Sequence, residues 1–275
     1  MFWADWQLYR RQAVWMSMLA MILVAVVWNM PTLQFLLYPF RLFVTFVHEA
    51  GHGLAAIATG GEFLAFEVAA NGAGIATTRG GTRAVIIPAG YLGASMFGAV
   101  LFYLTNTIPF PRLIALALGG AIALLAILYG RTSFLAWQVG LAFSSALIVI
   151  SWFGRRLWTV LLLNVLALMT GLNAVLDLKT LAHILMQRSQ GYHLSDASAF
   201  AQEIFPGTPA IMWAWIWAVV SVLILSVGVY FSLLNPLLSQ SLPASHILRR
   251  QQIYIEDHQA VNEHGSQISG KRHSE

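Results

Sequence analysis

The chain has 275 residues, of which 58% are hydrophobic and only 9% are charged. A soluble globular domain carries about 25% charged residues, so this composition excludes a protein that faces water on all sides. The formal net charge is +4, but the basic residues lie scattered between apolar blocks and form no basic stripe, which excludes nucleic acid as a partner. There are no cysteines, which excludes disulfides and thiolate metal ligands.

Seven apolar blocks are long enough to cross a lipid bilayer. They cover residues 13–30, 41–59, 84–105, 111–129, 134–151, 156–176 and 210–234. The sequence therefore predicts an all-α polytopic membrane protein with about six to seven transmembrane helices. We expect one membrane domain over residues 1–238, and a polar, disordered tail over residues 239–275.

The second block contains His48-Glu49-Ala50-Gly51-His52. On a helix, histidines at i and i+4 share one face and can bind one zinc ion, while the adjacent Glu49 can act as general base on water. The same pattern can arise by chance on an exposed helix, where it costs little. The apolar flanks argue against that reading, because three ionisable groups in a membrane are expensive without a purpose. We therefore predict that His48 and His52 are zinc ligands.

A catalytic zinc ion needs a third protein ligand, and the chain has just 11 acidic residues. Asp177 is the other carboxylate at the end of an apolar block, where it needs a cation as partner. The sequence therefore favours Asp177 as the third ligand, with an ion pair to Lys179 or Arg188 as the alternative. His183 and Asp196 are reserve candidates, although an interfacial histidine and a helix cap are their more ordinary roles.

The segment after the second apolar block, about residues 60–83, differs from the apolar blocks in its residue pattern. Residues 60–68 alternate weakly between apolar and polar, and Asn71-Gly72 then supplies a turn before Ile75-Ala76-Thr77-Thr78. This pattern predicts a short β-hairpin after the HExxH helix, and a plain glycine-rich loop is the alternative.

Small residues recur in the third block at Gly90, Gly93, Ala94 and Gly98. Small side chains at helical spacing allow helices to approach closely in lipid. The same closeness could bring this helix against the one that carries the two histidines.

The charges between blocks favour a cytoplasmic N-terminus. With alternating spans, the residues on the inner side are Arg10, Arg11, Arg79, Arg83, Arg131, Lys179 and Arg188, and those outside are Arg41, Arg112, Arg155 and Arg156. Seven spans would nevertheless place the tail, with Arg249 and Arg250, on the outer side. Either one block is re-entrant, or the tail departs from the rule that basic residues lie on the cytoplasmic side.

Several motifs together resemble the site-2-protease family of intramembrane zinc metallopeptidases, in a compact bacterial and plant branch. They are the His48–His52 pentapeptide followed by Gly53-Leu54-Ala55-Ala56 and a glycine-rich hairpin, the stretch Gly90-Tyr91-Leu92-Gly93-Ala94-Ser95, and the run from Ser195-Asp196-Ala197 to Pro209 before a Trp-rich span. The resemblance implies zinc held by two His and one Asp, a glutamate base, and hydrolysis of a peptide bond in a substrate's membrane span.

Two features depart from that family. Its third ligand usually lies in a Leu-Asp-Gly motif, whereas Leu178 follows Asp177 here. No separate peptide-binding domain is evident, so the hairpin or a regulatory membrane partner must recognise a single-span or membrane-embedded protein substrate within the lipid bilayer. The alternative is a non-catalytic protein, either a scaffold or assembly factor or a small transporter with a buried ion site. An intact Glu49 argues against the scaffold.

Overall fold

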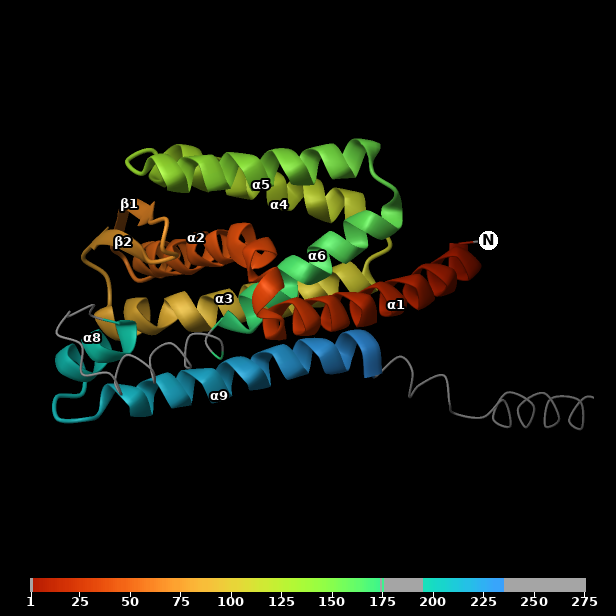
Figure 1. Ribbon diagram of the computed structural model, residues 1–275. Coiled ribbons are helices and arrows are strands. Elements are labelled where there is room, and N and C mark those ends of the chain that lie inside the picture. Colours follow the sequence, from red (N-terminus) through yellow and green to blue (C-terminus); the bar gives the residue numbers. More distant parts are fainter. Residues whose placement is uncertain (1, 174, 176–194, 235–275) are drawn as a thin grey trace, which may run out of the picture. The chain divides into compact units, whose positions relative to one another are not determined.

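The computed structural model describes residues 2–173, 175 and 195–234 (Figure 1). Within these residues, helices account for most of the chain and one hairpin interrupts them. The elements are α1 (Phe2–Asn29), η1 (Pro31–Leu33), α2 (Gln34–Ala58), β1 (Glu62–Val68), β2 (Gly74–Arg79), α3 (Arg83–Thr107), α4 (Pro111–Tyr129), α5 (Phe134–Phe153), α6 (Arg156–Gly171), α8 (Asp196–Glu203), α9 (Ala210–Val229) and η2 (Tyr230–Leu234). The tail predicted over residues 239–275 lies outside the described residues.

In the part of the chain that the structure describes, five helical segments are long and apolar enough to cross a membrane. They are Trp6–Asn29, Arg83–Thr107, Pro111–Tyr129, Phe134–Phe153 and Ala210–Leu234. Large apolar side chains on these segments remain exposed, as a lipid-facing surface requires. Helices α2 and α6 account for the other two apolar blocks, so each predicted block is a helix. The predicted all-α polytopic architecture with one short hairpin is confirmed.

Helix α3 lies at the centre and packs against α2, α6 and α9. Its small residues make this possible, because a Cβ atom on Gly98 would lie 2.5 Å from the carbonyl oxygen of Ala167 in α6. On α9, a Cβ on Gly228 would similarly lie 3.0 Å from the carbonyl oxygen of Ala99. The close approach predicted from the small residues of the third block is therefore present.

A buried chain of polar side chains joins α1 and α6 to α3. The Ser17 hydroxyl donates to Oδ1 of Asn106 at 2.8 Å, and Nδ2 of Asn106 donates to Oδ1 of Asn164 at 2.8 Å. All three side chains are buried. Hydrogen bonds of this kind hold helices together in lipid, where the hydrophobic effect does not.

The predicted hairpin is present as the antiparallel pair of β1 and β2, with a register irregularity between Phe63 and Ala65. Its inner side chains pack on the helices. The ring of Phe66 meets Phe46 of α2 edge-on at 4.8 Å, and Phe63 stacks on Tyr129 of α4 at 4.1 Å. Among the described residues β2 pairs with β1 alone, so its other edge is free.

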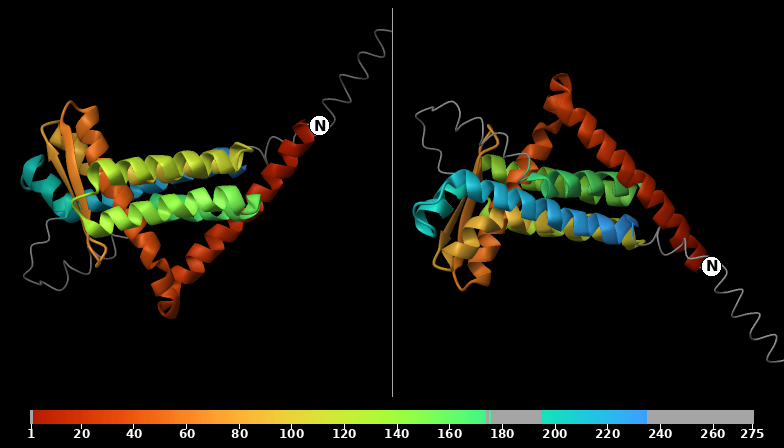
Figure 2. Two further views of the ribbon diagram at one scale, coloured as in Figure 1. Left: turned by 90° about the horizontal axis from the view of Figure 1, so that it is seen from above. Right: turned by 90° about the horizontal axis from the view of Figure 1, so that it is seen from below.

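The N-terminus of α1 and the hairpin lie at opposite ends of the helical bundle in each view (Figures 1 and 2). Helices α1 and α2 meet in a V, so the two helices together run once along the bundle, from the N-terminal end to the hairpin end (Figure 2). The start of α6 and the end of α9 lie with the N-terminus. There the Arg156 guanidinium sits 4.1 Å over the Tyr9 ring, and Arg10 donates to the carbonyl of Ser232 at 3.1 Å.

This arrangement corrects the expected grouping of charges. Simple alternation of spans put Arg10 and Arg156 on opposite sides, whereas their contacts put both at the N-terminal end. The reason is the V of α1 and α2. The first two apolar blocks together run along the bundle once, so the later helices start from the other end than simple alternation predicts.

Candidate metal centre

The local sequence of α2 lets other elements approach the two histidines. A Cβ atom on Gly51 would lie 2.6 Å from the carbonyl oxygen of Ala89, so only glycine permits α3 to pack this closely there. Gly53 lies directly against the ring of Phe63 in β1. The glycines of the motif therefore admit α3 on one side of α2 and the hairpin on another.

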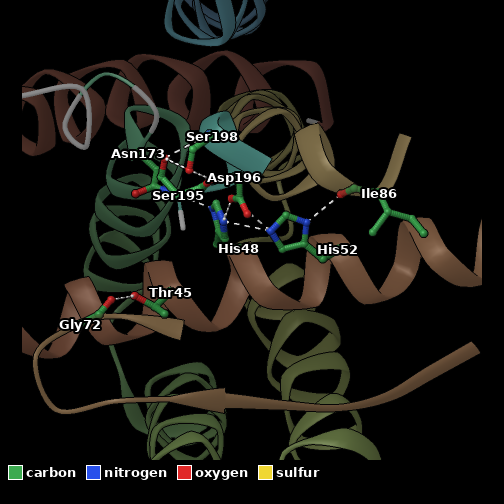
Figure 3. Close-up of polar contacts among 9 residues, drawn as sticks. All are labelled: Thr45, His48, His52, Gly72, Ile86, Asn173, Ser195, Asp196 and Ser198. Carbon is green, nitrogen blue, oxygen red and sulfur yellow. Dashed lines mark hydrogen bonds and ion pairs between the residues drawn. The ribbon is translucent and has the colours of Figure 1, made fainter. Parts of the chain in front are cut away.

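Three ligand-type atoms converge above α2 (Figure 3). Nε2 of His48 lies 2.9 Å from Oδ2 of Asp196 and 3.1 Å from Nε2 of His52, and Nε2 of His52 lies 3.3 Å from the same carboxylate oxygen. Both imidazoles are buried, and the Asp196 side chain is 28% exposed. The three atoms form a nearly equilateral triangle.

Helix α8 brings Asp196 to this triangle from far along the chain. Ser195 caps the helix by accepting a hydrogen bond from the backbone N–H of Ser198 at 3.3 Å, and Asp196 is the first helical residue. At the other end of α8, Glu203 accepts two hydrogen bonds of 2.8 Å from Arg83 of α3. The Arg83 guanidinium lowers the pKa of Glu203, so the pair stays ionised and fixes α8 to α3.

The contacts of each imidazole orient its Nε2 atom. Nδ1 of His52 lies 2.7 Å from the carbonyl oxygen of Ile86, which can only accept, so Nδ1 carries the proton and Nε2 of the neutral ring carries a lone pair. Nδ1 of His48 lies 3.3 Å from Nδ2 of the Asn173 amide, and turning this amide presents its oxygen, which accepts a hydrogen bond from a protonated Nδ1. The ring of Tyr91 meets the His48 ring edge-on at 4.5 Å. Partners of this kind hold metal-binding histidines in place.

These donors fit a zinc ion. The lone pair on Nε2 of His52 faces a carboxylate oxygen of Asp196 at 3.3 Å, an arrangement that repels unless a cation lies between the two atoms. In a tetrahedral site with bonds near 2.0 Å, neighbouring ligand atoms lie about 3.3 Å apart, close to the observed separations. Two imidazole nitrogens and one carboxylate also form a common ligand set of catalytic zinc, which keeps a fourth position open.

Gly90 lets α3 close one side of this centre. A Cβ atom there would lie 2.5 Å from Nε2 of His52 and nearer still to Nε2 of His48. Any side chain at this position would therefore occupy the space in which the ligand atoms meet.

Glu49 is buried on the same helix and is held by the hairpin. The backbone N–H of Ala76 in β2 donates to its carboxylate, and Gly74 lies so close that a Cβ atom would collide with that group. The hairpin is tied to α2 at this point, because the Thr45 hydroxyl donates to the carbonyl of Gly72 at 2.7 Å. Glycine at position 74 thus allows the strand to lie directly over the carboxylate.

A cavity of about 540 Å³ opens over these residues. Its walls come from α2, β2, α3, the end of α6 and α8. Since the Ala76 N–H points to Glu49, the free edge of β2 faces this cavity, and strand alternation turns the backbone of Gly74 and Thr78 the same way. The site therefore combines metal-type ligands, a carboxylate and a strand edge that no other strand covers among the described residues.

The structure places His48, Glu49 and His52 together on α2 and brings Asp196, one of the two reserve candidates, to the two histidines. Asp177, the favoured third ligand, and His183 lie outside the described residues. Among those described, Asp196 supplies the carboxylate that meets both histidines.

Other members of the site gave weaker signals or none in the sequence. In the sequence, Asn173 is simply a polar residue within an apolar block. Gly74 has the ordinary interpretation of a glycine in a turn, and Gly90 that of a small residue where helices pack. The carbonyl of Ile86 left no signal, because any residue type has one.

Comparison with known proteins agrees with this geometry. The sequence matches the Peptidase M50B-like family over residues 17–228, which is most of the chain. The chain belongs to that family. It is thus an integral membrane protein of the site-2-protease group of intramembrane metallopeptidases, as the resemblance implied. No curated protein and no solved structure gives a significant match.

Proposed function

We propose that this M50B-like protein is a zinc metalloendopeptidase that hydrolyses a peptide bond in or near a transmembrane segment of another protein. The observation that carries the proposal is the convergence of His48, His52 and Asp196 beside the buried Glu49. A purely structural metal site would not need a carboxylate aimed into a cavity next to its ligands. This argues against the scaffold alternative.

His48, His52 and Asp196 would hold the zinc ion. When bound, zinc supplies Lewis-acid activation of a carbonyl and makes a bound water more acidic. Asn173 and the carbonyl of Ile86 keep the two imidazoles turned toward the ion.

Glu49 acts as the general base and takes a proton from the attacking water. The N–H of Ala76 holds its carboxylate, so the base does not need to reorganise during the reaction. Water enters through the cavity, where the walls are protein rather than lipid and the irregular backbone of the hairpin is tolerated.

The substrate is a single-span or membrane-embedded protein, and its cleaved segment binds in extended form. A helix hides its own carbonyls, whereas an extended segment can add to the free edge of β2 and present a carbonyl to the zinc site. The described residues hold no separate peptide-binding domain, so a regulatory membrane partner is also part of the proposal.

The cytoplasmic location of the N-terminus belongs to the proposal too. Its support is the charge among the described residues. The end of the bundle where α1 and α6 begin and α3 ends carries Arg10, Arg11, Arg112, Arg155 and Arg156, and the hairpin end carries Arg79, Arg83 and Arg131. The mouth of the cavity then lies toward the opposite face.

The function is tested with purified protein in detergent and a set of single-span substrate proteins, with and without a zinc chelator. We expect one zinc ion per chain and cleavage that the chelator stops. Glu49→Gln should lower the cleavage rate by about 10²–10⁴-fold while zinc stays bound, because the change removes the base and no ligand. A wild-type protein without zinc would refute the peptidase and favour a scaffold or transporter.

A further inference from the structure

The cavity contains one arginine that the proposed chemistry does not use. The charged side chains that line it, apart from the histidines, are Arg41, Glu49, Arg83, Asp196 and Glu203. Four of these have partners on the cavity wall: Arg83 and Glu203 bind each other, Asp196 meets the two histidines, and Glu49 accepts from the hairpin. Among the described residues, Arg41 has no ion pair.

The position of Arg41 relative to the strand edge is fixed by contacts on both sides of it along α2. The Tyr38 hydroxyl donates to the carbonyl of Ala70 at 2.9 Å, and the Thr45 hydroxyl donates to the carbonyl of Gly72 at 2.7 Å. Nη2 of Arg41 would lie 3.9 Å from a Cβ atom on Gly72. The guanidinium therefore stands where the free edge of β2 begins.

We propose that Arg41 binds an acidic side chain of the substrate three or four residues from the scissile bond. Arg41 precedes Glu49 by about two turns of α2, which is about 12 Å along the helix axis. An extended peptide rises about 3.3 Å per residue, so a segment that lies on the β2 edge covers this distance in three to four residues. This inference rests on the proposed peptidase function.

The chemistry of the cavity favours a carboxylate as the partner. Arginine binds carboxylates through two parallel hydrogen bonds, and such charged pairs gain strength where water is scarce. The same cavity repels an acidic residue placed near Glu49 and Asp196, so a carboxylate is accepted at the Arg41 end and disfavoured at the centre. This binding site for an acidic side chain, the Arg41 subsite, would therefore set the register of the substrate on the β2 edge as well as its affinity.

The test uses purified full-length protein and a library of single-span peptides whose cleavage sites are mapped by mass spectrometry. We expect Asp and Glu to be enriched three or four residues from the cut, on one side of it. Arg41→Gln should reduce kcat/KM for those peptides by roughly tenfold and abolish the enrichment, because it removes charge-assisted hydrogen bonds to the acidic side chain. Arg41→Glu should shift the preference to Lys and Arg.

Arg11→Gln is the matched control, since Arg11 is exposed on α1 and does not line the cavity. Cleavage without an acidic preference, or a preference that survives Arg41→Gln, overturns the subsite while leaving the peptidase intact. No cleavage of any peptide by the wild type refutes the peptidase and the subsite together.

A lipid phosphate is the competing partner for an exposed arginine near a membrane surface. The reaction is therefore repeated in vesicles of phosphatidylcholine alone and of phosphatidylcholine with phosphatidylglycerol. An effect of Arg41→Gln that follows the anionic lipid content and ignores the peptide sequence assigns Arg41 to the lipid and overturns the proposal. The same acidic preference in both vesicles supports it.

Discussion

The carboxylate ligand of the metal centre illustrates how position in the chain and position in space can differ. The sequence favours Asp177, because an aspartate at the end of an apolar block needs a cation. Asp196 lies in a polar segment, where a helix cap is the simpler explanation, and it is indeed the first residue of α8. Its carboxylate nevertheless reaches both histidines, since α8 folds back over α2.

We predict that Asp196→Ala empties the metal site and that Asp177→Ala does not. Asp196 would contribute a direct bond to the ion, and even indirect partners of metal ligands change affinity by about 10–100-fold, so a larger loss is expected here. Zinc content of the two purified variants, measured by atomic emission, separates the two residues. Zinc lost from Asp177→Ala and retained in Asp196→Ala would restore the ligand that the sequence favoured.

A second prediction concerns the glycine that faces the imidazoles. Gly90→Ala should abolish zinc binding, because the new methyl group would collide with Nε2 of both His48 and His52. Gly93→Ala is the matched control one turn later on α3, where the nearest atom to a new Cβ is the Cα of Gly51 at 3.7 Å. Equal zinc content in the two variants would contradict the geometry of the centre.

Among the elements, the two strands of the hairpin have different roles. The inward side chains of β1 belong to the core, as shown by Phe66, which is fully buried against Phe46. Proline at Phe66 would thus disrupt packing and would not test the strand edge. The free edge belongs to β2, which lies over Glu49.

We predict that Thr78→Pro lowers peptide cleavage and leaves zinc bound. Its N–H lies on the same edge of β2 as that of Ala76, and proline removes this donor from the path of an added strand. The loss of one backbone hydrogen bond corresponds to a reduction in kcat/KM of roughly 2–10-fold. Thr78→Ala keeps the N–H and should cleave at the wild-type rate, and an equal loss in both variants would place substrate binding elsewhere.

At the scale of the whole molecule, the bundle has one end that carries the N-terminus and one that carries the hairpin and α8 (Figure 1). The polar chain of Ser17, Asn106 and Asn164 meets α3 near its last residue and joins helices, whereas the metal centre meets α3 near its start, at Ile86 and Gly90. Structural polar contacts and the proposed chemistry therefore occupy different parts of the bundle.

The orientation of this bundle in the membrane is predicted from its arginines. With the N-terminus in the cytoplasm, Cys introduced at Thr132, an exposed residue of the α4–α5 connection, should react with a membrane-impermeant maleimide on intact cells, and Cys introduced at Ile108, before α4, should not. The chain has no cysteine of its own, so each signal is unambiguous. Labelling of Ile108→Cys alone would reverse the orientation.

Local sequence patterns are enough to predict the helical membrane class, the hairpin and the cluster of His48, Glu49 and His52. Each depends on local patterns, namely apolar runs of bilayer length, strand alternation around an Asn-Gly turn, and the i, i+4 spacing on a helix. These patterns act over a few turns of chain and can be read without knowing the fold.

The distant groups that complete the site could not be predicted in this way, because they depend on how the elements pack. Asp196 and the carbonyl of Ile86 reach the histidines through contacts between residues far apart in the sequence. The V of α1 and α2 likewise depends on how α1 packs against α6, and it changed which arginines share one end. Contacts of this range arise from the packing of whole elements, so no local pattern of residue types specifies them.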